Sequence, residues 1–200
     1  MSDPATTQNR RAAKQFDSNH KMTKKGREKL LSTALISLSS FKIQNWHFVV
    51  VDDPEQRKWI REASWDQKQV TDASMLIILC TDLEAWEQEP PHCWHPPPES
   101  LREFMVPTIQ QYYNGLDPMQ RDEVMRSCGI AAEALMLSAQ SMGYDACPLD
   151  GFDADAVGEL INLPEDHAVC MFVAIGKSTG DALPPADELP MEEVVVTDSF

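Results

Sequence analysis

The chain has 200 residues, with 17 Lys and Arg against 32 Asp and Glu, and a formal net charge of −15 at pH 7. Long-range repulsion opposes binding to nucleic acid and to anionic membranes, so we expect neither as a partner. Hydrophobic residues make up 42% of the sequence, which suits one compact domain covering residues 1–200.

The first residues are polar, and no run reaches the roughly 18 apolar residues of a membrane span. We therefore expect a cytoplasmic protein without a signal peptide. The cysteines have neither framework nor zinc spacing, which favours reduced core thiols over disulfides. They are Cys80, Cys93, Cys128, Cys147 and Cys170.

A basic arm, residues 10–17, opens the chain with Arg10, Arg11 and Lys14. Residues 1–30 carry eight Lys or Arg and three Asp or Glu, a net charge of +5, while the remainder carries −20. A local positive region therefore persists in an acidic molecule. It indicates a small anion held in a pocket, although a basic arm taken alone is more often a solvated tail.

The first half of the chain predicts two strands and two helices. Thr23 caps a helix that ends near a loop at Ser39–Ser40, and the β-branched run 46–51 predicts a buried strand. Asp53–Pro54 starts a second helix, which we expect to bury Trp59, Ile60 and Ala63. The continuously apolar run 75–80 predicts a strand in the centre of a sheet.

Residues 82–100 are rich in Pro and Trp and predict an irregular surface excursion. Within it, His92, Cys93 and His95 resemble a metal cluster but have no fourth ligand and no helical spacing, so we expect no metal site. Trp86 and Trp94 suit lid packing and substrate contact equally well.

The second half predicts helices over 101–114 and from Asp117 to Gly143, followed by a loop over 148–152. Asp153 caps a short helix to Leu160, and 169–175 predicts a buried strand, then a loop over 176–190. A short strand at 194–196 lies far from the others and could join a partner's sheet. This order predicts an α/β sandwich with helices against a central sheet.

Common catalytic signatures are missing from the sequence. It contains no Gly-rich phosphate loop, neither G-x-G-x-x-G nor a Walker sequence, and no G-x-S-x-G nucleophile elbow. We therefore expect no catalytic side-chain nucleophile.

Four segments, in this order, resemble the nitroreductase family of FMN-dependent oxidoreductases over nearly the whole chain. The family's R-R-S-x-R/K-x-F start resembles 10–16, and its P-S-S-x-N-x-Q-P-W-x-F segment resembles 38–48. Its N-Q-x-Q-V-x-D-A-S segment resembles 66–74, and its G-L-x-x-x-P-x-x-G-F turn resembles 143–152. Any one segment alone is a common terminus or turn; their order and spacing carry the resemblance.

The resemblance implies roles for these segments. The arm would hold the FMN phosphate and the polar edge of the ring, and the serine loop would reach the cofactor of the other subunit. The third segment would meet the pyrimidine end of the flavin, with the Gln69 amide donating to N1 and O2, and backbone N–H groups after Pro148 would face N5 and O4. The implied cofactor-binding residues are Arg10, Arg11, Ala12, Lys14, Ser39, Ser40, Lys42, Asp66, Gln69, Pro148, Asp150 and Gly151.

The resemblance also implies a fold and an activity. The fold is a mainly antiparallel sheet flanked by helices, with the C-terminal strand exchanged in a homodimer. The activity is electron transfer from NAD(P)H through FMN to a nitroaromatic, quinone or similar acceptor by a ping-pong mechanism. Alternatives are a non-catalytic or weakly flavin-binding member acting in sensing or storage, and a dehalogenase or other specialised flavin enzyme.

The sequence departs from the family pattern at several positions. Ala12 replaces a Ser, Lys42 an Asn and Asn45 a Pro, and the family's C-terminal K-x-R-x-P has become Ala186-Asp187-Glu188-Leu189-Pro190. A carboxylate about 4 Å from a phosphate costs roughly 4 kcal/mol at an effective dielectric near 20. Either FMN binds weakly or Lys42, Arg11 or Lys177 compensates; we favour compensation, with Lys42 as the first candidate.

Overall fold

The computed structural model describes residues 11–87, 99–114, 117–180 and 189–200. One antiparallel sheet, in the order β1-β2-β4-β3, forms its centre. Its strands are β1 (Trp46–Val51), β2 (Met75–Asp82), β3 (Asp145–Leu149) and β4 (His167–Gly176). The mainly antiparallel sheet implied by the resemblance is confirmed.

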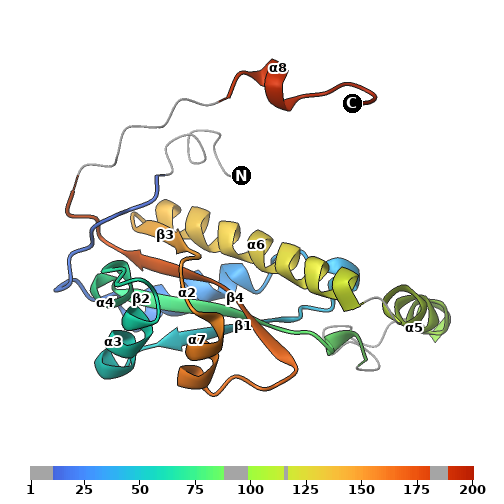
Figure 1. Ribbon diagram of the computed structural model, residues 1–200, viewed down its shortest axis with the longest axis horizontal. Coiled ribbons are helices and arrows are strands. Elements are labelled where there is room, and N and C mark those ends of the chain that lie inside the picture. The colour runs from blue at the N-terminus through green and yellow to red at the C-terminus, as the bar shows by residue number, and fades with distance from the viewer. Residues whose placement is uncertain (1–10, 88–98, 115–116, 181–188) are drawn as a thin grey trace.

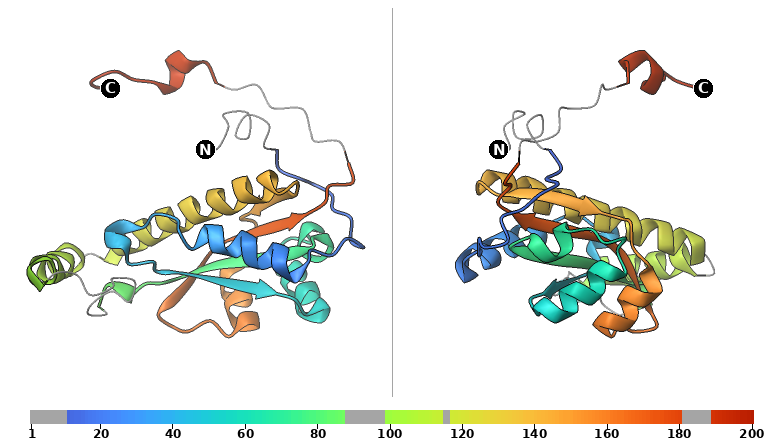
Figure 2. Two further views of the ribbon diagram at one scale, coloured as in Figure 1. Left: turned by 180° about the vertical axis from the view of Figure 1, so that it is seen from behind. Right: turned by 60° about the vertical axis from the view of Figure 1, so that its left-hand side comes forward.

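Helices cover both faces of this sheet (Figure 1). The helices are α2 (Lys24–Ala34), α3 (Pro54–Glu62), α4 (Gln69–Asp72), α5 (Glu99–Tyr113), α6 (Asp117–Ser141), α7 (Ala154–Ile161) and α8 (Met191–Val194), with 3₁₀ turns η1 (Ser40–Lys42) and η2 (Ala85–Glu87). Helices α2 and α6 pack on one face, while α3, α4 and α7 pack on the other, as the two views of Figure 2 also show.

Strand β2 explains why the core has two halves. Successive side chains of a strand point to opposite faces, so Met75, Ile77 and Leu79 pack against α2 and α6. Leu76, Ile78 and Cys80 pack against α3, α4 and α7. All residues of β2 are buried, which confirms the expected central strand.

The expected helix boundaries follow capping chemistry. The side chains of Thr23, Asp53 and Asp153 each accept a hydrogen bond from a backbone N–H in the first turn of α2, α3 and α7. Gly143 follows α6 with φ of 74°, a conformation that favours glycine. These three starts and this stop confirm the sequence predictions.

Two predictions in this part of the chain were wrong. Trp59 is 51% exposed, and Arg57 instead turns inward, where its Nε and Nη1 donate to the carbonyls of Val51 and Ala73 at 2.8 and 2.6 Å. Burial lowers the pKa of Arg57. Pro148 and Leu149, expected in a loop, end strand β3. Because β3 is an edge strand, a proline there is tolerated.

The expected strand at 194–196 does not form in the single chain, because Val194 ends α8 and the next residues have no strand pairing. The prediction assigned this strand to a partner's sheet, and a strand needs a neighbour to form. Of the expected excursion over 82–100, residues 88–98 lie outside the described part, including His92, Cys93, Trp94 and His95. Among the residues that are described, no helix is long and apolar enough to cross a membrane.

Candidate functional site

From Arg11 onward the basic arm is docked on the sheet rather than extended into solvent. Ala12 forms a parallel bridge with Ala146 at the start of β3, and the N–H of Ala13 donates to the carbonyl of Ala146 at 3.0 Å. Ala13 is buried in the core beside β3. The arm therefore extends the sheet edge, and the solvated-tail alternative is wrong for residues 11–17.

Phe16 anchors the far end of the arm. Its side chain is 5% exposed and lies on Gly176, where an added Cβ would meet Phe16 Cδ1 at 2.8 Å and the backbone N of Ser74 at 3.1 Å. Phe16 bridges Ser178, and the N–H of Asp17 donates to the carbonyl of Lys177 at 2.8 Å. The absence of a side chain at Gly176 thus permits the docking.

Three cations lie along this edge. Arg11 is half-buried and Lys14 is exposed. Burial raises the pKa of the Cys147 thiol, and the nearby charge of Lys14 acts on it in the opposite direction. Lys177 Nζ donates to the carbonyl of Gly143 and lies 4.5 Å from the ring centroid of Tyr144. Lys177 therefore sits beside the arm, while Arg10 lies outside the described residues.

Beyond β3, the Asp150–Gly151 turn meets the loop before α4. Gln67 Nε2 donates to the carbonyl of Gly151 at 2.8 Å. The ring of Trp65 lies on Gly151, where an added Cβ would be 2.6 Å from Trp65 Cε3. Two of the expected cofactor segments, around 66–69 and 148–151, are therefore neighbours in space.

Within this loop, the side chain of Asp66 is directed to Arg61. Arg61 Nε donates to Asp66 Oδ1 at 2.7 Å, and Arg61 Nη1 donates to Thr71 Oγ1 at 3.2 Å. Asp66 is mostly exposed, and Gln69 is the first residue of α4. The carboxylate is thus held by a guanidinium.

The serine loop, residues 39–42, is fixed by its own contacts. Ser39 Oγ accepts from the N–H of Gln44 at 2.9 Å. Ser40 donates to the carboxylate of Glu123 near the start of α6, and Tyr113 Oη–H donates to the same carboxylate. Burial raises the pKa of Glu123, and the Ser40 hydroxyl and N–H lower it.

Aromatic contacts tie the serine loop to α5. The Phe41 ring lies edge-on to Tyr112 and Tyr113, with ring centroids 5.7 and 6.1 Å apart. Lys42 is exposed at the end of η1. The loop therefore belongs to the α5 end of the molecule, opposite the blue arm in Figure 1.

The expected site is thus divided between the two ends of α6. Ser40 contacts Glu123 near the start of the helix, and the arm lies beside Lys177, which contacts Gly143 just past its end. At about 1.5 Å per residue, the helix rises roughly 27 Å from Glu123 to Ser141. One chain brings together the arm, 66–69 and 148–151, and does not bring Ser39, Ser40 and Lys42 to them.

Backbone strain is concentrated in the two expected site loops. Five of the seven described non-glycine residues with positive φ lie there, namely Phe41, Lys42, Gln44, Trp65 and Asp66. Such conformations cost about 1–3 kcal/mol each and often mark ligand sites. Nothing in the sequence predicted this strain, because the residues are not glycines.

Several residues of this region were not expected from sequence. Trp65 packs on the turn at Gly151, Arg61 holds Asp66, and Glu123 holds Ser40. Trp65 immediately precedes the 66–74 segment, which was the available signal. Glu123 is distant in sequence from Ser40, so nothing local connected them.

The donor set fits a flavin mononucleotide. Among the described residues, the N–H groups of Asp150 and Gly151 donate no backbone hydrogen bond. Asp150 and Gly151 directly follow β3. Arg11 and Lys14 belong to the arm, which lies beside β3. A ligand with an anionic tail and a polar ring edge matches this order.

Known proteins are similar to this chain over most of its length. The Nitroreductase family model matches residues 7–177. The chain is 44% identical to Protein DrgA of Synechocystis over 173 residues, 86% of this chain and 82% of that relative. It is 31% identical to an oxygen-insensitive NADPH nitroreductase of Helicobacter pylori over 186 residues, 86% of each protein.

Solved structures show the same fold. The chain matches ydfN of Bacillus subtilis at a TM-score of 0.87 and 28% identity, over 96% of each chain. It matches an Exiguobacterium sibiricum structure, described as a nitroreductase in complex with FMN, at a TM-score of 0.83 and 28% identity, over 96% of this chain and 94% of the other. The match over residues 7–177 and the identity to DrgA lead to one conclusion: the chain belongs to the nitroreductase family of oxidoreductases.

Proposed function

We propose that this protein is an FMN-dependent oxidoreductase that passes electrons from NAD(P)H to a nitroaromatic, quinone or similar acceptor. The observation that carries the proposal is the docked arm. It aligns Arg11 and Lys14 with β3, whose continuation presents the N–H groups of Asp150 and Gly151. Cations for a phosphate and donors for a ring edge therefore follow one another along a single sheet edge.

At the phosphate end, Arg10, Arg11 and Lys14 would hold the dianion through charge-assisted hydrogen bonds. Ala12 lacks the hydroxyl of the family's Ser, so it contributes only its backbone. Lys177 adjoins the end of the arm through its carbonyl, which accepts from the Asp17 N–H, and is our choice for the cation that compensates for Ala186 and Glu188. The last two residues lie outside the described part of the chain.

At the ring end, Asp150 and Gly151 would donate backbone N–H groups, and Gln69 would donate its amide. Pro148 precedes this turn at the end of β3. Gln67 holds the Gly151 carbonyl, which orients the turn that follows Asp150. The exposed ring of Trp65 covers Gly151, so it would bound the cofactor site on that side.

The serine loop supports a homodimer. Ser40 contacts Glu123, from which α6 rises roughly 27 Å to Ser141, so the serine loop lies at the other end of the helix from the arm. A twofold symmetric pair would place the loop of each chain at the arm of the other. This arrangement also gives a role to Lys42, which would act across the interface and not within its own chain.

When bound, FMN supplies the hydride and electron-transfer chemistry, and the protein binds and orients it. This explains why no side-chain nucleophile is needed. The named activity of the Helicobacter pylori relative, an NADPH nitroreductase, and the FMN in the Exiguobacterium structure support the nicotinamide and the cofactor. With one site for both substrates, nicotinamide would leave before the acceptor enters, as in a ping-pong mechanism.

The alternative, a non-catalytic or weakly flavin-binding member, rests on the stretch Ala186-Asp187-Glu188, which has two acidic residues and neither of the two family cations. The visible spectrum of the purified protein separates the two functions. We expect a yellow protein that is bleached by anaerobic NADH or NADPH and recovers its colour with a quinone. A colourless protein that cannot be reconstituted with FMN would contradict the proposal.

A further inference from the structure

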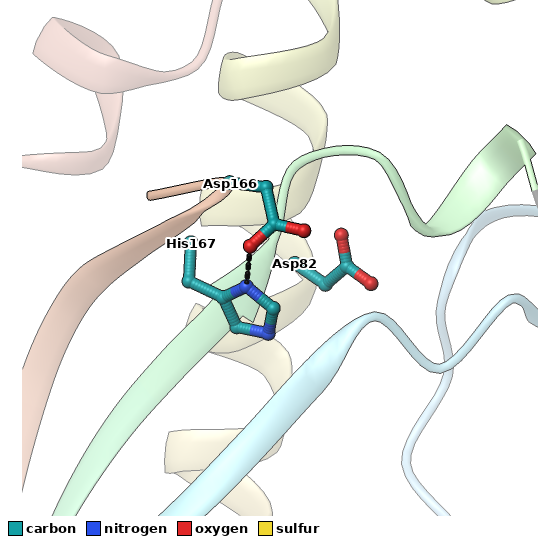
Figure 3. A group of neighbouring side chains, drawn as sticks. All are labelled: Asp82, Asp166 and His167. Carbon is teal, nitrogen blue, oxygen red and sulfur yellow. Dashed lines mark hydrogen bonds and ion pairs between the residues drawn. The ribbon is translucent and has the colours of Figure 1, made fainter. Parts of the chain in front are cut away.

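A second cluster of polar side chains lies at the opposite end of β2 from α4. It joins Asp82, the last residue of β2, to Asp166 and His167 at the start of β4 (Figure 3). One ligand atom from each of the three residues lies within 4.8 Å of the others. None of these residues takes part in the proposed flavin site.

Strand register adds two more residues to this cluster. Asp82 pairs with His167, and because Trp46 pairs with Thr81, Asn45 comes opposite Asp82. Residues opposite each other in a ladder point to the same face of a sheet. His47, two residues after Asn45, points to that face as well, and its ring centroid lies 5.0 Å from that of His167.

The backbone holds the cluster in place. The N–H of Glu84 donates to Asp82 Oδ1 at 2.8 Å, and the N–H of Leu83 donates to the carbonyl of Asp166 at 2.9 Å. His167 Nδ1 lies 2.6 Å from Asp166 Oδ1. A carboxylate on one ring nitrogen fixes a histidine so that the other nitrogen can bind a metal.

Asn45 gives an independent sign of a missing ligand. It is 5% exposed, and its Oδ1 is buried without a hydrogen-bond partner among the described residues. A buried hydrogen-bond acceptor without a partner costs free energy. The residue opposite Asn45 is Asp82, whose carboxylate is also an acceptor. A cation would give Asn45 Oδ1 its missing partner and take the Asp82 carboxylate as a second ligand.

We propose that Asp82, His167 and His47 bind a divalent transition-metal ion, with Asp166 orienting His167 and Asn45 Oδ1 completing the site. Mixed imidazole and carboxylate ligands suit Zn²⁺ and its first-row neighbours better than Mg²⁺ or Ca²⁺. The bound ion would link the ends of β1, β2 and β4 through these ligands. We expected no metal from sequence, because these ligands come from three separate strands.

The test is Zn²⁺ titration of the EDTA-treated full-length protein by calorimetry, with flavin content held constant. We expect one tight site, and we expect Asp82→Asn or His167→Gln to weaken it at least about 100-fold. Asp166→Asn should weaken it about 10–100-fold, as for other outer partners of metal ligands. Because the amide oxygen introduced by Asp82→Asn could still accept the Glu84 hydrogen bond, this variant should keep the metal-free fold, which circular dichroism checks.

Two control variants distinguish this site from other histidines. His20→Gln alters a histidine bonded to Ser74, and a triple change of His92, Cys93 and His95 to Ala, Ser and Ala removes the candidate ligands of the Pro-rich segment. Both should bind Zn²⁺ as the wild type does. Absence of a tight site in the wild type, unchanged binding by Asp82→Asn, or loss of binding only in the triple variant would each overturn the proposal.

Discussion

The two halves of the candidate flavin site are built differently. The arm depends on long-range contacts, because Ala13 and Phe16 are buried against β3 and Gly176. The serine loop depends on polar and aromatic contacts with Glu123, Tyr112 and Tyr113 at the other end of α6. Each half is fixed within its own chain, yet one chain keeps them apart.

This difference bears on the assembly proposed for the site. In the proposed dimer, two fixed halves would meet without either loop refolding, so little conformational entropy would be lost on association. Changes to the arm should therefore lower both stability and flavin affinity. Changes to the serine loop should act mainly on flavin binding or on its local electrostatics.

The largest effect is expected from Phe16→Ala. Truncating a buried phenylalanine costs about 3–5 kcal/mol, and here it also removes the anchor of the arm. Urea unfolding should show a loss of about 3 kcal/mol, together with weaker FMN binding. Phe200→Ala, at a fully exposed position, is the matched control, and a loss below about 1 kcal/mol for Phe16→Ala would mean that the arm is not anchored there.

Gly176→Ala tests the same contact from the other side. Its Cβ would meet Phe16 and the backbone of Ser74, which cannot move aside cheaply, so we expect a loss of about 2 kcal/mol. Gly129→Ala provides the contrast, because nothing lies within 4 Å of its Cβ. In a helix this change should stabilise by about 0.5–1 kcal/mol. Equal thermal shifts for the two variants would rule out the close approach.

Lys177→Met tests compensation for the missing C-terminal cations. We expect FMN affinity to fall about tenfold, or ~1.4 kcal/mol, since one charge-assisted contact is lost. Lys25→Met, at an exposed position on α2, should leave affinity unchanged. If fluorescence titration gives the same affinity for both variants, Lys177 does not serve the phosphate.

The smallest effect concerns the serine-loop end. Burial raises the pKa of Glu123, so the native state binds more protons than the unfolded state between the two pKa values. The free energy of unfolding contributed by this group is therefore present at low pH and is lost as pH rises through the folded pKa. In urea titrations at several pH values, Glu123→Gln should reduce this loss of the free energy of unfolding with rising pH, and Glu62→Gln should not. An unchanged slope in Glu123→Gln would show that Glu123 ionises as easily in the fold as outside it.

Much of the fold was predictable because local chemistry determines it. Capping residues Thr23, Asp53 and Asp153 marked helix starts, and the apolar run of β2 marked the central strand. Strand β3 was not predicted because it is short and contains Pro148. A proline is tolerated there because β3 lies at the edge of the sheet. The prediction that Trp59 is buried was wrong. Hydrophobicity alone does not reveal that the Arg57 side chain donates to two buried backbone carbonyls.

The candidate site was predictable in its segments and not in its assembly. Motif order located the arm, the serine loop and the turn at Gly151, but long-range contacts determine which of them meet. Lys42 was our first choice for the compensating cation; within one chain Lys177 is the residue next to the arm. The cluster of Asp82, Asp166 and His167 was invisible to sequence, since strand pairing alone brings it together.

The most direct test of the central claim uses two defective variants, Arg11→Ala/Lys14→Ala in the arm and Lys42→Glu in the serine loop. Each alone should bind FMN poorly. A heterodimer of the two, purified through different tags, has one site with an intact arm and an intact loop, so about half of its sites should bind FMN with wild-type affinity. A heterodimer that binds no better than its parents, or a protein that is monomeric by ultracentrifugation, would contradict a site shared between two chains.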